Sequence, residues 1–271
     1  MIFERIRRGS EFPRTFGVKA SIVYRGVSTL PEGTMLGDGE LLRKLSRLLV
    51  KRILYIYSLY RSRTTVRRLS FLEPLYPSTE SLEETSIQCF SARILDDLAV
   101  CYLRAWFNIN SAPTRVKREV FDYSKIREKR LRRFFLEEAE RREFDVLEQR
   151  LGLYHSKYLL GLRGLADFVS ADPPLVIEFC LTPIYFIDHM LPRVSAYALA
   201  YRLMYGCCPL TLIVSSHNLA VAVVDYSEFN YEKVFRELSW LSKADIKYVE
   251  PTSTKHCSSC IYRLRCPKRK S

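Results

Sequence analysis

The sequence predicts an α/β fold in which a mixed sheet is flanked by helices. Over the last two thirds of the chain, segments with helical spacing of apolar residues alternate with short apolar runs of strand length, in the order helix, hairpin, helix, hairpin, helix. The turn Asp172-Pro173-Pro174 separates two of the strand candidates. Pro192 and Gly206 bracket one helical segment, as a first-turn proline and a stop glycine do.

Residues 1–87 differ from the rest and are expected to form a basic N-terminal extension of uncertain structure, whereas residues 88–271 form the main domain. Within the extension, apolar residues at helical spacing predict an amphipathic helix over 39–60. Segment 73–78 holds two prolines, which disfavour helix, and is predicted to be a linker. The sequence is compatible with three interpretations of this region: an accessory basic arm, a partly disordered segment and an over-long start to the reading frame.

Apolar patterns also predict the elements of the main domain. A helix is expected to begin near Ser91 and to end near Trp106-Phe107. The segment 124–150 is predicted to be a helix whose many charges form a solvated face. The other expected elements are a strand over 158–169 with an acid near its end, a strand over 175–180, a helix over 191–205, strands over 210–215 and 219–225, and a helix over 230–242.

The charge balance favours a polyanionic partner. The chain has 43 Lys and Arg against 30 Asp and Glu, for a formal net charge of +13, and nucleic acid is the simplest partner for such a surface. No run of about 18 uncharged apolar residues occurs, so no membrane span is expected. The early arginines are not followed by the apolar stretch of a secretory signal, so a cytoplasmic location is expected.

The C-terminal cysteines indicate a metal centre. A chain with eight cysteines and no secretory signal favours metal binding over a disulfide framework. Cys257 and Cys260 are spaced so that both can bind one metal centre from a single turn, and Cys266 can bind the same centre from the next turn. Zinc and iron–sulfur sites usually take four ligands, so a fourth cysteine is expected upstream. Ligand chemistry alone does not separate zinc from an iron–sulfur cluster.

Two acids lie on the adjacent strand candidates. An ionised carboxylate in an apolar strand costs several kcal/mol unless it is paired or binds a cation. Asp167 and Glu178 could therefore share one hard cation, Mg²⁺ or Mn²⁺, which activates water in phosphate hydrolysis. The other interpretation is a pair of acids that face solvent or neighbouring arginines.

Several short segments together resemble the CRISPR-associated Cas-four family, whose members are RecB-like nucleases of the PD-(D/E)xK superfamily. The resemblance covers residues 88–271, about two thirds of the chain. It is carried by Gly161-Leu162-Arg163-Gly164-Leu165-Ala166-Asp167-Phe168-Val169, Ile177-Glu178-Phe179-Cys180, Arg193-Val194-Ser195-Ala196-Tyr197-Ala198-Leu199 and the closing cysteines. The individual motifs are short, but their order and spacing are jointly specific.

The resemblance implies a RecB-like, restriction-endonuclease-type sheet closed by a four-cysteine iron–sulfur cluster. The segment Cys101-Tyr102-Leu103-Arg104-Ala105-Trp106-Phe107 is similar to the family segment that carries the first cluster cysteine. Cys101 rather than Cys89 is therefore the implied fourth ligand, with Cys257, Cys260 and Cys266. The implied cluster is of the 4Fe-4S type in preference to 2Fe-2S.

The active site departs from the family pattern at three positions. Asp167 and Glu178 match, but the family lysine is replaced by Cys180, which has no fixed positive charge. Loss of such an electrostatic group typically costs about 10²–10³ in rate. The family histidine is missing, and the first histidine of the chain is His155 beside a strand, expected to be structural. Arg193 stands where the family has glutamine, one helical turn before Tyr197, and can engage a phosphate bidentately.

These features lead to one expected function and two alternatives. The resemblance implies a metal-dependent DNA exonuclease that processes single strands or DNA ends in CRISPR spacer acquisition, alongside the CRISPR integrase. Asp167, Glu178, Arg193 and Tyr197 would form its catalytic site. The first alternative is a catalytically weakened iron–sulfur subunit that binds DNA or the integrase. The second is a zinc-containing DNA-binding protein without nuclease ancestry.

Overall fold

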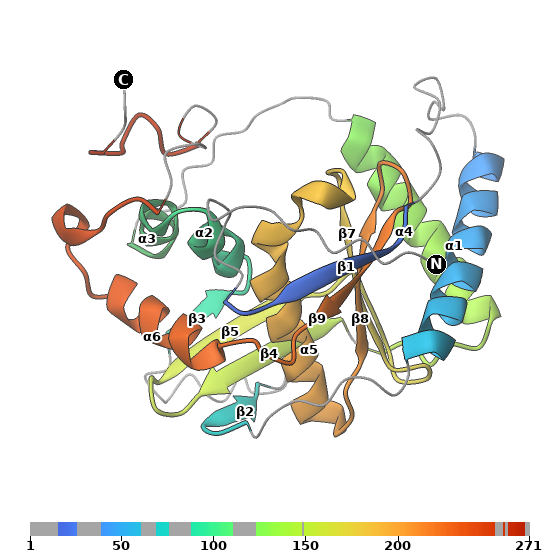
Figure 1. The fold of residues 1–271 in the computed structure, drawn as a ribbon, viewed down its shortest axis with the longest axis horizontal. Coiled ribbons are helices and arrows are strands. Elements are labelled where there is room, and N and C mark those ends of the chain that lie inside the picture. Colours follow the sequence, from blue (N-terminus) through green and yellow to red (C-terminus); the bar gives the residue numbers. More distant parts are fainter. Residues whose placement is uncertain are drawn as a thin grey trace.

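The fold comes from a computed structural model, which describes most of the chain. The described residues are 16–25, 39–60, 69–75, 88–110, 123–147, 149–252, 257 and 260–268. Within them the chain is a mixed α/β structure with two sheets and flanking helices (Figure 1). None of the helices in these ranges is both long and apolar enough to cross a membrane.

The larger sheet has five strands. Its spatial order is β1 (Lys19–Tyr24), β9 (Val221–Asp225), β8 (Leu210–Ser215), β7 (Leu175–Cys180) and β6 (Phe168–Ser170). The pair β7 and β8 is parallel, and the other neighbours are antiparallel. The sheet is therefore mixed, as the sequence predicts.

A second, smaller sheet has four strands. Its order is β2 (Leu72–Pro74), β4 (Arg150–His155), β5 (Leu160–Leu165) and β3 (Gln88–Ser91). Strands β3 and β5 run parallel, and β4 pairs antiparallel with β2 and with β5. The chain passes from this sheet to the larger one between β5 and β6, so the predicted single strand over 158–169 is two strands in different sheets.

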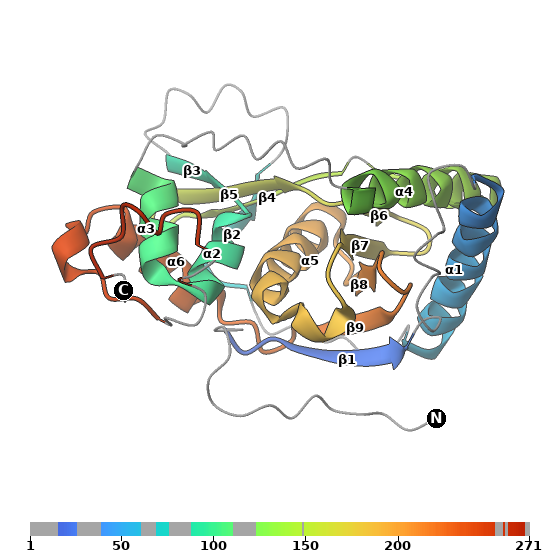
Figure 2. The same cartoon turned by 90° about the horizontal axis from the view of Figure 1, so that it is seen from above.

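The helices complete the layers around the two sheets. They are α1 (Gly39–Tyr60), α2 (Ile94–Val100), α3 (Tyr102–Asn110), α4 (Tyr123–Arg141), α5 (Leu191–Tyr205) and α6 (Tyr231–Leu241), with short 3-10 turns η2 (Ile184–Phe186), η3 (Asp188–Met190) and η4 (Ile246–Tyr248). Helix α5 lies between the sheets and contacts strands of both (Figure 2). Helices α1 and α4 pack against one another and cover the opposite face of the larger sheet.

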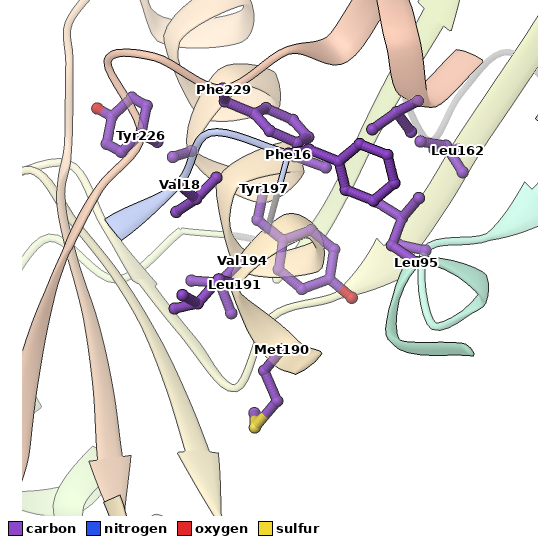
Figure 3. Packing of buried hydrophobic residues seen from close by; sticks show 14 of the residues in the cluster. Phe16, Val18, Leu95, Leu162, Met190, Leu191, Val194, Tyr197, Tyr226 and Phe229 are labelled. Carbon is purple, nitrogen blue, oxygen red and sulfur yellow. The ribbon is translucent and has the colours of Figure 1, made fainter. Parts of the chain in front are cut away.

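Helix α5 is buried around its whole circumference in its first three turns, which suits its central position. Every residue from Leu191 to Tyr201 is buried, as expected for a helix covered on all sides. Tyr197 of α5 belongs to the same apolar cluster as Leu95 of α2 and Leu162 of β5 (Figure 3). Pro192 lies in the first turn, and Gly206 ends the helix with φ 78°. The bounds predicted from the sequence are confirmed.

Strand β7 presents its two faces to different helices. Leu175, Ile177 and Phe179 belong to the cluster formed with α1 and α4. Val176 and Cys180 belong to the cluster formed with α5. Successive side chains of a strand point to opposite faces, so Glu178 shares the face of Val176 and Cys180 and is directed toward α5.

The described parts of residues 1–87 are integral to the fold and are not appended to it. Strand β1 pairs with β9 along its length and forms one edge of the larger sheet. Helix α1, predicted over 39–60, has those bounds and packs on α4. The predicted linker over 73–78 is partly strand β2, and its residues 76–78 lie outside the described residues.

Two predicted helices have different bounds in the structure. The helix expected from Ser91 is two helices separated by Cys101, whose extended backbone (φ −161°, ψ 127°) breaks the pattern. The helix expected over 124–150 ends at Arg141, and strand β4 begins at Arg150. Periodicity does not detect either break because the apolar spacing continues across it.

Candidate functional site

Glu178 lies at the centre of a buried ionic cluster beneath the start of α5. Arg193 Nη1 is 3.3 Å from Glu178 Oε2, and Arg193 Nε donates to Asp96 Oδ1 of α2 at 3.0 Å. The side chains of Glu178 and Arg193 are 3% and 9% exposed, so both charges are almost withdrawn from water. One guanidinium therefore joins two carboxylates from elements far apart in the sequence.

Asp167 lies next to this cluster, at the junction between the two sheets. It directly precedes Phe168, which pairs with Ile177, so the register sets Asp167 beside Glu178. Its Oδ2 accepts a hydrogen bond from the Phe179 backbone N–H at 2.8 Å, and its Oδ1 is 2.6 Å from Arg132 Nη1 of α4. Both carboxylate oxygens thus have partners from the chain.

Burial raises the pKa of the three acids. The pKa of Glu178 rises to about 8, first because of desolvation, against which Arg193 acts, and then because of the neighbouring Asp167 and Asp96. Desolvation also raises the pKa of Asp96 to about 6 and that of Asp167 above its usual range, although Arg193 and Arg132 respectively oppose these shifts. Burial alone would lower the pKa of Arg193, but Glu178 and Asp96 outweigh it and raise that pKa. The guanidinium therefore stays charged.

Cys180 and Tyr197 contribute no ionised group to the cluster. Burial raises the pKa of the Cys180 thiol to about 12, and its Sγ donates to the Thr182 carbonyl oxygen at 3.3 Å. Cys180 is therefore a neutral thiol at the position where the resemblance implies a lysine. Burial and Glu178 likewise raise the pKa of Tyr197, whose hydroxyl lies against the backbone of Gly164.

Helix α4 brings charged side chains to the site, so the prediction that its charges form a solvated face is wrong for part of the helix. Arg132 reaches Asp167 and also lies 3.5 Å from Glu128 Oε1, one turn earlier. The pKa of Glu128 is raised by burial and by the charge of Asp167. Arg127 donates to the Ser216 carbonyl oxygen at 3.0 Å. The remaining charges of α4 include exposed side chains such as Arg133.

The carboxylates fit a hard divalent cation in their chemistry, but among the described residues of the cluster the one buried carboxylate oxygen without a hydrogen-bond partner belongs to Glu178. Glu178 Oε1 is buried and has no hydrogen-bond partner among the described residues. Such an orphaned oxygen is a suitable ligand for Mg²⁺ or Mn²⁺. The neighbouring carboxylate, Asp167, has both of its oxygens engaged by Arg132 and the Phe179 N–H. In the ranges that the structure describes, no three His, Cys, Asp or Glu side chains form a ready-made single-ion site.

Cys257 is affected by the other three cysteines that the resemblance implies as cluster ligands. The pKa of Cys257 is raised by burial and then by the thiols of Cys101, Cys266 and Cys260. Cys89 is not among these groups. It is exposed on β3 and lies close to Gly161 of β5. Cys101, and not Cys89, is therefore among the thiols that affect Cys257, although no three of the described cysteines form a group that could hold a metal ion.

Side chains around Cys101 hold the C-terminal segment in place. The Tyr262 ring stacks on Phe107 of α3 with centroids 5.0 Å apart. The Tyr102 backbone N–H, next to Cys101, donates to Thr252 Oγ1 at 3.2 Å. Cys101 and Cys266 both pack on the main apolar cluster. Helix α3, which begins directly after Cys101, and the C-terminal segment therefore lie at the same end of the molecule (Figure 1).

His155 lies away from the carboxylates, in agreement with the structural role expected for it. It pairs with Leu160 at one end of the β4–β5 hairpin, whereas Asp167 follows the other end of β5. Its ring is fully buried and lies among those of Phe71, Tyr158 and Phe235. Burial lowers its pKa, so it is neutral at physiological pH.

Sequence reasoning missed two side chains of the site, Asp96 and Arg132. Asp96 has a second acid beside it and Arg132 occurs on a helix with many charges, so nothing in their spacing distinguishes them from solvated residues. Asp96 is followed directly by Asp97, which pairs with Arg104 and Asn108 and does not pair with Arg193. Only the contact across the fold identifies which acid belongs to the site.

Comparison with known proteins gives little further information. No family model matches the chain. No curated protein matches it either. One similar solved structure is the crystal structure of a protein designated SSO0001, with a TM-score of 0.39 and 12% sequence identity over 86% of this chain and 97% of that chain. At this score and identity the likeness does not establish a shared fold.

Proposed function

We propose that this chain is a metal-dependent DNA nuclease that trims single strands or DNA ends during CRISPR spacer acquisition. The observation that carries the proposal is the pairing of Asp167 with Glu178 in one buried site, where Glu178 keeps an oxygen without a partner among the described residues. The family resemblance supports the RecB-like assignment, the CRISPR context and association with the integrase.

Each side chain of the site has a proposed role. Asp167 and Glu178 would hold Mg²⁺ or Mn²⁺, and the cation would supply activation of water and stabilisation of charge on the phosphate. Arg193 keeps a full positive charge beside Glu178 and supplies part of the electrostatic role of the missing lysine. Tyr197, held against Gly164, fixes the face of α5 from which Arg193 extends.

The four cysteines would hold an iron–sulfur cluster that joins the C-terminal segment to Cys101. The support is the contact between the C-terminal part of the chain and the start of α3, where Tyr262 stacks on Phe107 and the Tyr102 N–H donates to Thr252, next to Cys101. Thiolates are the usual ligands of such clusters, and zinc accepts them as well. Visible absorbance and iron content of anaerobically purified protein distinguish the two: a colourless protein with one zinc per chain would support the zinc alternative.

Helix α1 supports a nucleic-acid partner. Its outer face exposes Arg43, Lys44, Arg47, Lys51 and Arg52, and the helix has a single acid, Glu40. It packs on α4, the helix whose Arg132 reaches the site. A basic face of this kind is suited to the phosphate backbone of DNA.

A second candidate is a catalytically weakened subunit that binds DNA ends or the integrase. Two salt bridges favour it, because they already engage the carboxylates: Arg132 pairs with Asp167, and Arg193 pairs with one oxygen of Glu178. The neutral Cys180 thiol favours it as well. In this case the ionic cluster is structural, and the DNA is held without hydrolysis.

Cleavage of end-labelled single-stranded DNA with Mn²⁺ separates the two candidates. The assay compares cluster-loaded wild-type protein with Asp167→Ala and with the matched control Asp97→Asn, which changes a neighbouring acid outside the site. Cleavage by wild type and Asp97→Asn, lost in Asp167→Ala, supports the nuclease. Cleavage by none of them, with DNA binding retained, overturns it and supports the binding subunit.

A further inference from the structure

Helix α1, at one end of the molecule, has an apolar strip on its exposed side (Figure 2). The main apolar side chains of the helix, such as Leu49 and Ile53, are buried in the cluster formed with α4 and the larger sheet. Leu48, Tyr55 and Leu59 are instead 53%, 46% and 42% exposed. They are separated by seven and four positions, a spacing that places residues on one face of a helix. The three side chains therefore form a continuous strip on the surface.

Basic side chains border this strip on both sides. With about 3.6 residues per turn, the exposed Lys44 and Lys51 fall along one edge of the strip and Arg52 along the other. The guanidinium of Arg52 lies over the ring of Tyr24 in β1, 4.7 Å from its centroid, and 5.9 Å from the centroid of the Tyr55 ring. The surface thus combines apolar side chains, an exposed aromatic ring and positive charge.

This combination fits a single strand of nucleic acid better than a duplex or a second copy of the chain. Proteins that bind single strands place basic side chains along the phosphates and stack the bases on aromatic rings or arginine planes. A duplex keeps its bases stacked on each other, so its phosphates could meet Lys44 and Lys51 while the apolar strip stayed in water. A second copy of α1 would set the same lysines against one another, and such like charges repel.

We infer that the exposed strip of α1 binds unpaired bases, with Tyr55 as the ring on which a base stacks, and that it gives the protein a preference for single-stranded over duplex DNA. This inference rests on the DNA partner of the proposed function and adds substrate selection to it. The cation–π contact with Arg52 restrains the Tyr55 ring before DNA binds. Less side-chain freedom is then lost when a base stacks on it.

The test is binding of a fluorescently labelled strand of about 15 thymidines, within the usual range of single-strand sites, by the full-length chain. Anisotropy is measured without divalent cations, so that the strand is not cut. Tyr55→Ala is expected to weaken binding about 5- to 150-fold, the usual effect of removing one base-stacking ring. Tyr55→Phe retains the ring and is expected to stay near wild type. Tyr248→Ala is the matched control, because Tyr248 is 69% exposed but lies on η4, outside the strip.

A strand of abasic sugars separates base stacking from support of the helix. This strand has the phosphates but no bases, so Tyr55→Ala is expected to bind it as wild type does. An equal loss for the abasic and thymidine strands would overturn the inference, because Tyr55 would then act through the structure of α1. Unchanged affinity of Tyr55→Ala for the thymidine strand would also overturn it. So would equal affinity of wild type for the thymidine strand and for a duplex of the same length.

The inference and the proposed function fail in different ways. Thymidine-strand binding that depends on Tyr55, with no cleavage in Mn²⁺, overturns the nuclease and supports the inference. Cleavage by wild type with unchanged binding in Tyr55→Ala overturns the inference alone. No binding of any DNA by wild type overturns both and leaves an acidic protein surface as the partner that the strip fits.

Discussion

Arg193 Nη1 lies 3.3 Å from Glu178 Oε2, while Glu178 Oε1 is buried without a hydrogen-bond partner among the described residues. The carboxyl group therefore has a charged partner at one of its two oxygens. Asp167 and Asp96 add negative charge close by, and desolvation acts on all three acids. Buried charge of this kind is destabilising unless a further partner compensates it, which links the stability of the protein to pH.

Glu178→Gln is expected to stabilise the cation-free protein more at pH 8 than at pH 5. The pKa of Glu178 rises from 4.5 to about 8 on folding, so between these values the folded state retains a proton that the unfolded chain has released. Stability contributed by this group therefore falls as pH rises through that window. Arg193 and Arg132 lower the shift, whereas Asp167 and Asp96 increase it. Thermal melts of both proteins in a chelator check the prediction, and a constant difference across the window would contradict it.

Gly164→Ala is expected to destabilise the protein by about 1–3 kcal/mol, the usual cost of overpacking a core. A Cβ at Gly164 would collide with the ring and hydroxyl of Tyr197, whose side chain is enclosed in the central cluster (Figure 3). Gly39→Ala is the matched control, because its nearest neighbouring atom would be 4.0 Å away. Chemical denaturation measures both. Equal stability of the two variants would show that α5 accommodates the methyl group by a small shift.

Cys101→Ala is expected to abolish the visible absorbance of anaerobically purified protein and to lower its melting temperature. The cluster would close a loop of about 150 residues, and closure of a long loop restricts the unfolded chain. Cys89→Ala is the control, because Cys89 is exposed and is not among the thiols that act on Cys257. Retained absorbance in Cys101→Ala, or its loss in Cys89→Ala, would exclude Cys101 as the fourth ligand. An unchanged melting temperature in the cluster-free protein would remove the structural role.

Lys44→Ala combined with Lys51→Ala is expected to reduce the salt dependence of single-stranded DNA binding. Each phosphate contact contributes about 0.7 to the slope of log affinity against log salt for single strands, so the slope should fall by about 1.4. Both lysines are exposed on the outer face of α1. Lys157→Ala, at the exposed turn between β4 and β5, is the control. Fluorescence anisotropy at several salt concentrations measures the slopes, and an unchanged slope in the double variant would exclude this face from the DNA path.

Local sequence patterns were sufficient for the elements that lie next to the site. Helix α5, bracketed by Pro192 and Gly206, and strand β7 have the predicted bounds. The turn between Asp167 and Glu178 is short, so the proximity of these two acids follows from hairpin geometry alone. Periodicity also placed Arg193 and Tyr197 on one face of α5, because residues four apart share a face.

The sequence by itself thus determined the α/β class, most of the element order and the two acids of the hairpin. Only the tertiary structure decided that β1 pairs with β9, that Arg132 holds Asp167 and that Asp96 holds Arg193. The last contact joins residues 97 positions apart. Periodicity describes which face a residue shares with its near neighbours, whereas the partner of a buried charge is chosen by the packing of whole elements. The pairing of buried charges therefore cannot be predicted from the local spacing of charged residues.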